Sequence, residues 1–176
     1  SGSAVDSDSD GRSDLEELLD GSDPLDFFNG EEVVLKVVSG ATRSLAIFTG
    51  DLEPGVYDDA EVLNTIKQLV LSRSYVRIRV LVADPERALR RSNRFVHLAR
   101  RLSSFVEFRQ LGEKFLGRPE AFLVADESGV VYRSNRERWD GVADTREPAV
   151  ARLYLQDFDQ MWQDSTPAPE TRRLSL

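Results

Sequence analysis

From residue 31 onward, apolar side chains recur along the chain at two different spacings. A helical spacing of three to four residues occurs in four segments, at residues 31–41, 58–72, 85–103 and 148–163. A strand-like pattern, alternating or apolar throughout, occurs in five shorter segments, at residues 44–49, 75–83, 105–109, 120–125 and 130–133. The sequence therefore predicts the element order α-β-α-β-α-β-β-β-α.

This order also predicts the fold class. Strands that alternate with helices form largely parallel sheets, because each helix crosses over the sheet and returns the chain to the same end. Residues 126–129 read Asp-Glu-Ser-Gly, a sequence typical of a tight turn, so the last two strands are expected to pair antiparallel. We predict an α/β domain in which a layered, mixed and largely parallel sheet is flanked by helices.

The two ends of the chain differ in composition from this middle part. Residues 1–22 are rich in Ser, Asp and Gly, and such a composition cannot bury enough apolar surface to offset chain entropy. We interpret them as an acidic flexible linker or the remnant of a tag. Pro167 and Pro169 prevent the last helix from continuing, so residues 165–176 are predicted to form a tail. The α/β domain is expected to span residues 23–164.

Charge is distributed unevenly along the chain, whose net charge at pH 7 is −8. Residues 1–30 carry nine acidic side chains against Arg12 alone, so the rest of the chain is neutral overall. Within that neutral part, residues 73–118 hold twelve basic and four acidic side chains. A net acidic protein repels polyanions, so nucleic acid is predicted to be an unlikely partner, while the basic stretch is compatible with a local anionic ligand.

Missing residue types exclude several kinds of site. The chain has no Cys, which excludes disulfides, thiol catalysis and Cys-ligated zinc, and its single His97 excludes metal sites made of several histidines. We therefore expect no cofactor. No apolar stretch approaches about 18 residues, so no membrane span is predicted. Because no signal peptide is recognisable, the expected location is the bacterial cytoplasm.

Several stretches of the sequence resemble one half of a phospholipase D-like domain. They are SLAIFTG (44–50), the helix start at Tyr57-Asp58, RIRVLV (77–82), and residues 121–126 followed by 129–134. The chain also resembles an uncharacterised bacterial family with that fold, sometimes found beside acetyltransferase domains. The stretches that carry this second resemblance are DLEPGVYD (51–58), HLARRLSS (97–104), AFLVADESG (121–129), RWDGVAD (138–144) and the closing RRLSL. The resemblance implies a phospholipase D-like fold, a homodimer, and an upstream enzyme domain such as an acetyltransferase.

The motif that carries phospholipase D chemistry is degenerate in this sequence. Active members of that family resemble one another in a His-x-Lys-x4-Asp motif, whose His attacks phosphorus and whose Lys binds phosphate oxygens. If Asp126 takes the place of the motif Asp, the His position falls on Pro119 and the Lys position on Ala121. Proline offers no nucleophile and alanine no charge, so the resemblance implies a domain without catalytic residues.

Two groups of residues remain candidates for binding. One is a vestigial pocket after the first strand, where open α/β sheets bind ligands, together with the altered motif region. Its candidate residues are Asp51, Glu53, Tyr57, Asp126, Arg133, Ser134 and Asn135. The other is an anion-binding strip on one helix face at spacing i, i+4, i+7 and i+11, formed by Arg90, Arg94, His97 and Arg101. The solvated face of an ordinary amphipathic helix explains the same spacing.

Two further stretches have chemistry of their own. Asp6, Asp8, Asp10 and Glu17 fit the spacing of an EF-hand calcium loop. However, Ser13 stands where such loops usually have an aliphatic residue, so no bound metal is predicted. Residues 138–146 form a polar loop in which Trp139 either contributes to recognition or anchors the loop on the core.

Three functions are consistent with these observations. The favoured prediction is a non-catalytic phospholipase D-like binding or assembly module, which serves as a regulatory or dimerising domain of a larger bacterial protein. The alternative is a residual phosphodiesterase or nucleic-acid-processing enzyme that uses Asp126, Ser134 and the arginines, although the absent nucleophile argues against it. The second alternative is a calcium-binding secreted module, which a metal titration would identify.

Overall fold

The computed structural model describes residues 30–91, 93–138 and 141–168. Its helices are α2 (Gly30–Ser39), α3 (Ala60–Ser72), α4 (Pro85–Arg91), α5 (Asn93–Arg101) and α6 (Pro148–Gln163), with a 3-10 turn at Glu113–Phe115. Its strands are β1 (Ser44–Thr49), β2 (Arg77–Val82), β3 (Val106–Gln110), β4 (Ala121–Ala125), β5 (Gly129–Arg133), β6 (Val142–Asp144) and β7 (Thr166–Pro167). The expected strands are all present, and β1 and α6 begin and end at the predicted residues.

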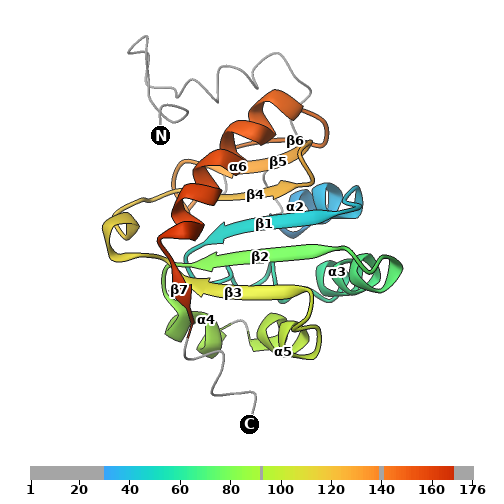
Figure 1. The fold of residues 1–176 in the computed structure, drawn as a ribbon, viewed down its shortest axis with the longest axis horizontal. Helices are drawn as coiled ribbons and strands as arrows, with labels where there is room; N and C mark the ends of the chain where they lie inside the picture. Colours follow the sequence, from blue (N-terminus) through green and yellow to red (C-terminus); the bar gives the residue numbers. More distant parts are fainter. Residues whose placement is uncertain (1–29, 92, 139–140, 169–176) are drawn as a thin grey trace.

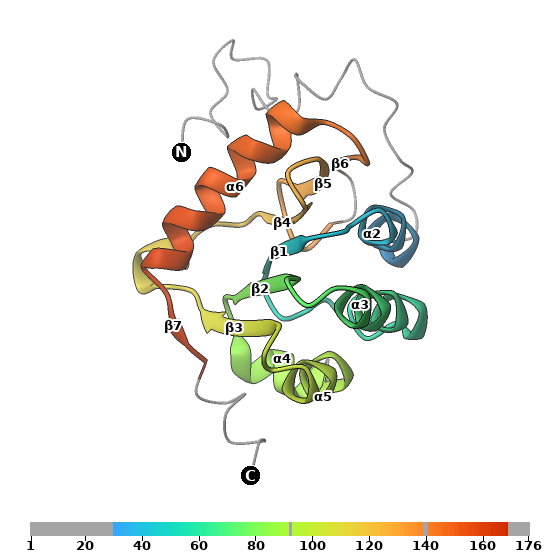
Figure 2. The same ribbon diagram turned by 45° about the vertical axis from the view of Figure 1, so that its right-hand side comes forward.

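The strands form one seven-stranded sheet in the order β6-β5-β4-β1-β2-β3-β7. Helices α2, α3 and α5 lie over one face of the sheet, and α6 crosses the other face (Figures 1 and 2). Within β1, Leu45 and Ile47 pack into the core on the side of α2 and α3, whereas Ala46 and Phe48 pack into the core under α6. This strand is apolar throughout because both of its faces are covered.

The mixed α/β class is confirmed, but the prediction of a largely parallel sheet is not. Parallel pairing is limited to β1 with β2 and β2 with β3, whereas the other pairs of the sheet are antiparallel. The reason lies in the connection between β3 and β4. Residues 111–120 contain a 3-10 turn instead of a crossover helix. The chain therefore enters β4 from the same end of the sheet at which β3 finishes, and β4 runs antiparallel to β1.

The structure describes the segment predicted as one helix at residues 85–103 as α4 and α5, and Ser92 between them lies outside the described residues. Helix α4 ends at Arg91 and α5 begins at Asn93, so Arg90 lies on a different helix from the other three residues of the predicted anion-binding strip.

Two short strands were not predicted. Strand β6 pairs antiparallel with β5, and β7 pairs antiparallel with β3. The segment that forms β7 was expected to belong to the tail, because Pro167 and Pro169 prevent the last helix from continuing. A proline is tolerated there because β7 is an edge strand, with no neighbour on one side among the described strands.

Candidate functional site

The candidate site lies at the end of the sheet where β1 and β2 reach their C-terminal residues. In the loop after β1, Leu52 and Glu53 adopt φ angles of 64° and 22°, which are uncommon for residues other than glycine and carry a conformational cost. The Leu52 amide donates a hydrogen bond to Thr49 Oγ1 at 3.1 Å, and the Glu53 amide donates one to Asp51 Oδ1 at 3.2 Å. These bonds hold a loop that brings the carboxylates of Asp51 and Glu53 to this end of the sheet.

Glu53 forms a buried ion pair with Arg133, the last residue of β5. The guanidinium donates to one carboxylate oxygen, and the Thr49 hydroxyl donates to the other at 3.0 Å. Arg133 also donates to the backbone carbonyls of Arg136 and Arg138, each at 3.0 Å. Burial raises the pKa of Glu53, although the Arg133 charge and the Thr49 hydrogen bond oppose this effect. The Arg133 cation is thus engaged by protein groups on several sides.

Ala121, at the Lys position of the phospholipase D motif, lies directly opposite Arg133. The two residues are paired in register between β4 and β5, so their side chains lie on the same face of the sheet. Tyr57 lies beside them, and the cavity that these residues line has a volume of about 10 Å³, too small for a phosphate group. Burial raises the pKa of the Tyr57 hydroxyl, and the Glu53 charge reinforces this change. The place of the motif Lys is therefore filled by protein side chains, and a phosphate group has no room there.

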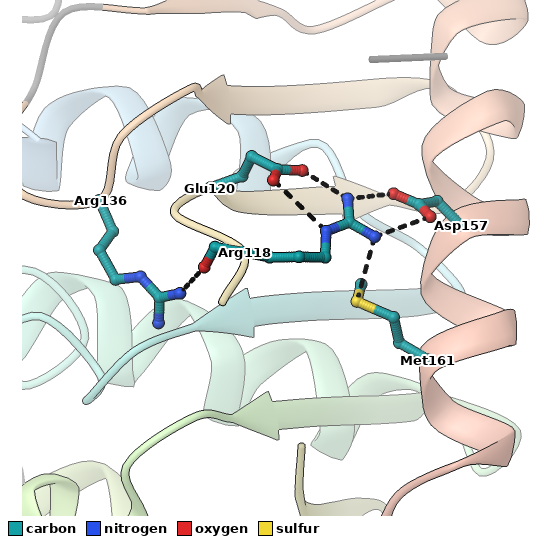
Figure 3. Close-up of polar contacts among 5 residues, drawn as sticks. All are labelled: Arg118, Glu120, Arg136, Asp157 and Met161. Atoms are coloured by element: carbon teal, nitrogen blue, oxygen red, sulfur yellow. Dashed lines mark hydrogen bonds and ion pairs between the residues drawn. The ribbon is translucent and has the colours of Figure 1, made fainter. Parts of the chain in front are cut away.

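Pro119, at the His position of the motif, directly follows Arg118, whose side chain binds Asp157 of α6 (Figure 3). Arg118 donates hydrogen bonds to Glu120 and to Asp157 of α6, the latter at 3.0 and 2.5 Å. Burial alone would lower the pKa of Arg118, but the bonds to Asp157 and Glu120 raise it above its ordinary value. Arg136 donates to the Arg118 carbonyl through its side chain and to the Pro119 carbonyl through its amide. Structural contacts therefore fix the segment on both sides.

Glu53 also lines an open pocket with a volume of about 390 Å³. On one wall, Asp51 Oδ2 lies 3.2 Å from Arg87 Nε and 3.6 Å from a terminal nitrogen of Arg91. The two arginine side chains remain about half exposed, at 48% and 47%. On another wall, Arg136 lies so close to Gly50 that a Cβ there would be 2.7 Å from the Arg136 side chain. The other lining residues are Pro54, Asp84, Leu116 and Glu137.

We call the basic residues of α4 and α5, two of which also line the pocket, the arginine surface. It consists of Arg87, Arg90, Arg91, Arg94, His97, Arg100 and Arg101. Glu86 is the one acidic residue in the sequence of these two helices, and it pairs with Arg90 at 2.8 Å. Arg94, His97 and Arg101 are exposed. Within the part of the chain that the structure describes, neither Arg94 nor Arg101 forms an ion pair, so their charges are not neutralised by a neighbour there.

The structure divides the predicted vestigial pocket between two ends of the sheet. The residues at the ends of β1 and β5 are Asp51, Glu53, Tyr57 and Arg133. Asp126 lies at the other end, where its carboxylate accepts hydrogen bonds from the backbone amides of residues 42–44. Ser134 and Asn135 are exposed after β5, and Asn135 Oδ1 accepts a hydrogen bond from the Glu137 amide at 2.9 Å. Asp126 therefore holds the start of β1 and is remote from the pocket.

Several predicted residues lie outside the described part of the chain. They are the calcium candidates Asp6, Asp8, Asp10 and Glu17, together with Trp139 and the linker expected at residues 1–22. Among the residues that the structure does describe, no three or more His, Asp or Glu side chains are grouped so that they could hold a metal ion. Those residues also include no helix with the length and apolar character needed to cross a membrane.

Sequence reasoning missed three residues that shape this region. Asp157 is a buried acid on the apolar face of α6, beside Phe158 and Met161, and an acid at a core position is a signal of a buried partner. That partner, Arg118, immediately precedes the altered motif. Arg136 had no distinctive signal, since its position depends on the close approach to Gly50.

A family model described as a domain of unknown function, DUF7931, matches residues 29–174. No curated protein matches the chain. Two solved structures have similar folds. One is TrmBL2, described as an archaeal chromatin protein with a novel mode of DNA binding, at 11% identity and a TM-score of 0.58. This match covers 88% of the present chain and 58% of TrmBL2, so the chain spans just over half the length of that protein. The other is NucT from Helicobacter pylori, at 12% identity and a TM-score of 0.54, with 81% and 92% of the two chains covered.

At these identities the likeness extends to the fold. It nevertheless contradicts the prediction that nucleic acid is an unlikely partner, because TrmBL2 has this fold and is a DNA-binding protein. That prediction was based on the net charge of the whole chain, which residues 1–30 dominate. Polyanions respond to the local charge of the surface that they approach, and the charge of the arginine surface is positive.

Proposed function

The chain belongs to the DUF7931 family, and we propose that it is a non-catalytic phospholipase D-like module that binds the phosphate backbone of nucleic acid. The arginine surface is the observation that carries this proposal. Exposed guanidinium groups bind phosphates through charge and through paired hydrogen bonds. Because Arg94 and Arg101 have no ionic partner in the described part of the chain, no ion pair with a described residue has to be broken before they bind.

Two further observations support the proposal. The likeness to NucT, which has the phospholipase D-like fold, supports the assignment of this chain to that fold. The sealed position around Ala121 and Arg133 supports a role without catalysis, since it offers no nucleophile and no open cation at the place of the motif. The TrmBL2 likeness adds a precedent for a DNA-binding protein with the same architecture.

Fluorescence anisotropy with labelled duplex DNA, single-stranded DNA and RNA tests the proposal. We expect binding that weakens steeply between about 50 and 200 mM salt, because phosphate contacts release counterions. The double variant Arg94→Ala/Arg101→Ala should bind more weakly and lower the salt slope on duplex by about 2, since two phosphate contacts are removed.

Arg152→Ala is the matched control. Arg152 is an exposed arginine on α6, which crosses the opposite face of the sheet (Figure 2), so its removal should leave the affinity unchanged. Equal losses in both variants, or an affinity that does not respond to salt, would contradict binding at the arginine surface. Turnover of a phosphodiester substrate by the purified chain would contradict the absence of catalysis.

A further inference from the structure

The pocket between Asp51 and Arg136 has the properties of a site for one phosphate group. The geometry points to the terminal phosphate monoester of a nucleic-acid strand, or of a free nucleotide, as its ligand. This inference rests on the proposed function, because it names the part of the nucleic acid that the pocket would select. It involves side chains outside the degenerate motif, since Arg87 and Arg91 belong to α4.

The first argument is the way in which Arg87 and Arg91 are paired. A single carboxylate oxygen, Asp51 Oδ2, serves both guanidinium groups, at 3.2 and 3.6 Å. The second oxygen of Asp51 is already engaged by the Glu53 amide. Two half-exposed arginines therefore converge on one anionic oxygen and retain N–H donors that this carboxylate does not satisfy. A phosphate monoester carries three terminal oxygens and about two negative charges. It can therefore replace Asp51 and accept hydrogen bonds from both guanidinium groups.

The second argument is the size and lining of the pocket. A volume of about 390 Å³ lies in the range of small-molecule sites, which is roughly 300–1,000 Å³. The carboxylates of Asp84 and Glu137 line it as well, so a continuous run of phosphates would be repelled there, whereas sugar hydroxyls and base amino groups can donate to them. Leu116, which is 45% exposed, and Pro54 provide apolar surface for a base. These properties suit one nucleotide better than the interior of a strand.

The third argument is position. Arg87 and Arg91 belong both to the pocket and to the arginine surface, so a strand that lies along α4 and α5 would reach the pocket with its end. Arg136 faces the same space from the loop after β5, and its position is held by its bond to the Arg118 carbonyl (Figure 3). The pocket and the arginine surface therefore have Arg87 and Arg91 in common.

The test compares matched single-stranded oligonucleotides that end in 5′-phosphate, 3′-phosphate or hydroxyl groups, together with the free nucleotide AMP. We expect one of the phosphorylated ends to bind about tenfold more tightly than the hydroxyl end, as charge-assisted hydrogen bonds of this kind contribute. Arg87→Ala/Arg91→Ala should abolish this preference. Arg94→Ala/Arg101→Ala should weaken all oligonucleotides while the preference persists. Asp51→Asn should strengthen binding of the phosphorylated end, because the competing carboxylate is removed.

The outcomes separate this inference from the proposed function. If oligonucleotides bind with salt dependence but without any preference for a phosphorylated end, the pocket inference is wrong and the backbone proposal remains. If AMP binds in a manner that depends on Arg87 and Arg91 while oligonucleotides show no binding at the arginine surface, the pocket inference stands and the proposed function is wrong. Absence of binding by every probe overturns both. Circular dichroism of each variant confirms that it is folded.

Discussion

Two arginine–carboxylate pairs lie at the end of the sheet where β1 and β5 finish, and they differ in their access to water. Glu53 and Arg133 are buried, with side chains 10% and 3% exposed, and further hydrogen bonds hold both. Asp51, two residues earlier, pairs with arginines of α4 that are about half exposed. A buried pair cannot exchange its partner without leaving an uncompensated charge, whereas an exposed pair exchanges at little cost. Loss of one partner should therefore cost more in the first pair than in the second, whose arginines can take another anionic partner.

Removal of one arginine from each pair is the strongest way to test this comparison. Arg133→Met keeps most of the side-chain volume but leaves Glu53 buried without its partner, and it should lower the free energy of unfolding by about 3–5 kcal/mol. Arg87→Met removes an exposed partner of Asp51, and it should cost less than about 1 kcal/mol. Urea denaturation at pH 7 measures both values. Similar losses in the two variants would show that the burial of the first pair does not distinguish it.

The ion pair between Arg118 and Asp157 offers a second comparison within one helix. Asp157 is 2% exposed and bonds Arg118 through both oxygens, whereas Asp159, also on α6, is 51% exposed and pairs with Arg79 at 2.7 Å. We expect Asp157→Asn to cost about 1.5–3 kcal/mol, because it weakens charged hydrogen bonds in a buried place. Asp159→Asn should cost less than about 1 kcal/mol. Urea denaturation of the two variants provides the comparison, and an equal cost would assign no special role to the buried contact.

Most elements of the fold could be predicted because their burial is periodic. The observed bounds of β1 match the predicted ones, since both faces of the strand are covered and its central residues are apolar. The direction of β4 could not be predicted, because it depends on the short connection at residues 111–120 rather than on any pattern within the strand. The same limit applies to β7, whose two residues form a strand through pairing with β3 and have no strand pattern of their own.

The candidate site was harder to predict than the fold. Asp51 and Glu53 were identified from their place after the first strand, but the sequence does not reveal which of the two is buried, because that depends on the φ angles of Leu52 and Glu53. Asp126 was grouped with them by motif spacing, although the antiparallel direction of β4 carries it to the other end of the sheet. The position of residues along the chain therefore predicted where the site lies, but the direction of the strands determined which residues belong to it.

The smallest effect concerns the pH dependence of the buried pair. Burial raises the pKa of Glu53 above the ordinary value of 4.5, so the folded protein binds a proton there more tightly than the unfolded chain does. The stability that Glu53 contributes is then fully present below pH 4.5 and decreases as the pH rises through the folded-state pKa. Glu53→Gln cannot titrate, so the free energy of unfolding of the wild type should fall relative to that of the variant as the pH rises from 4.5 into the neutral range. Urea denaturation of both proteins across this range measures the difference, in which the other carboxylates cancel. A difference that moves in favour of the wild type as the pH rises would mean that the Arg133 charge outweighs burial, and the buried pair would then resemble the exposed one in its preference for the ionised carboxylate.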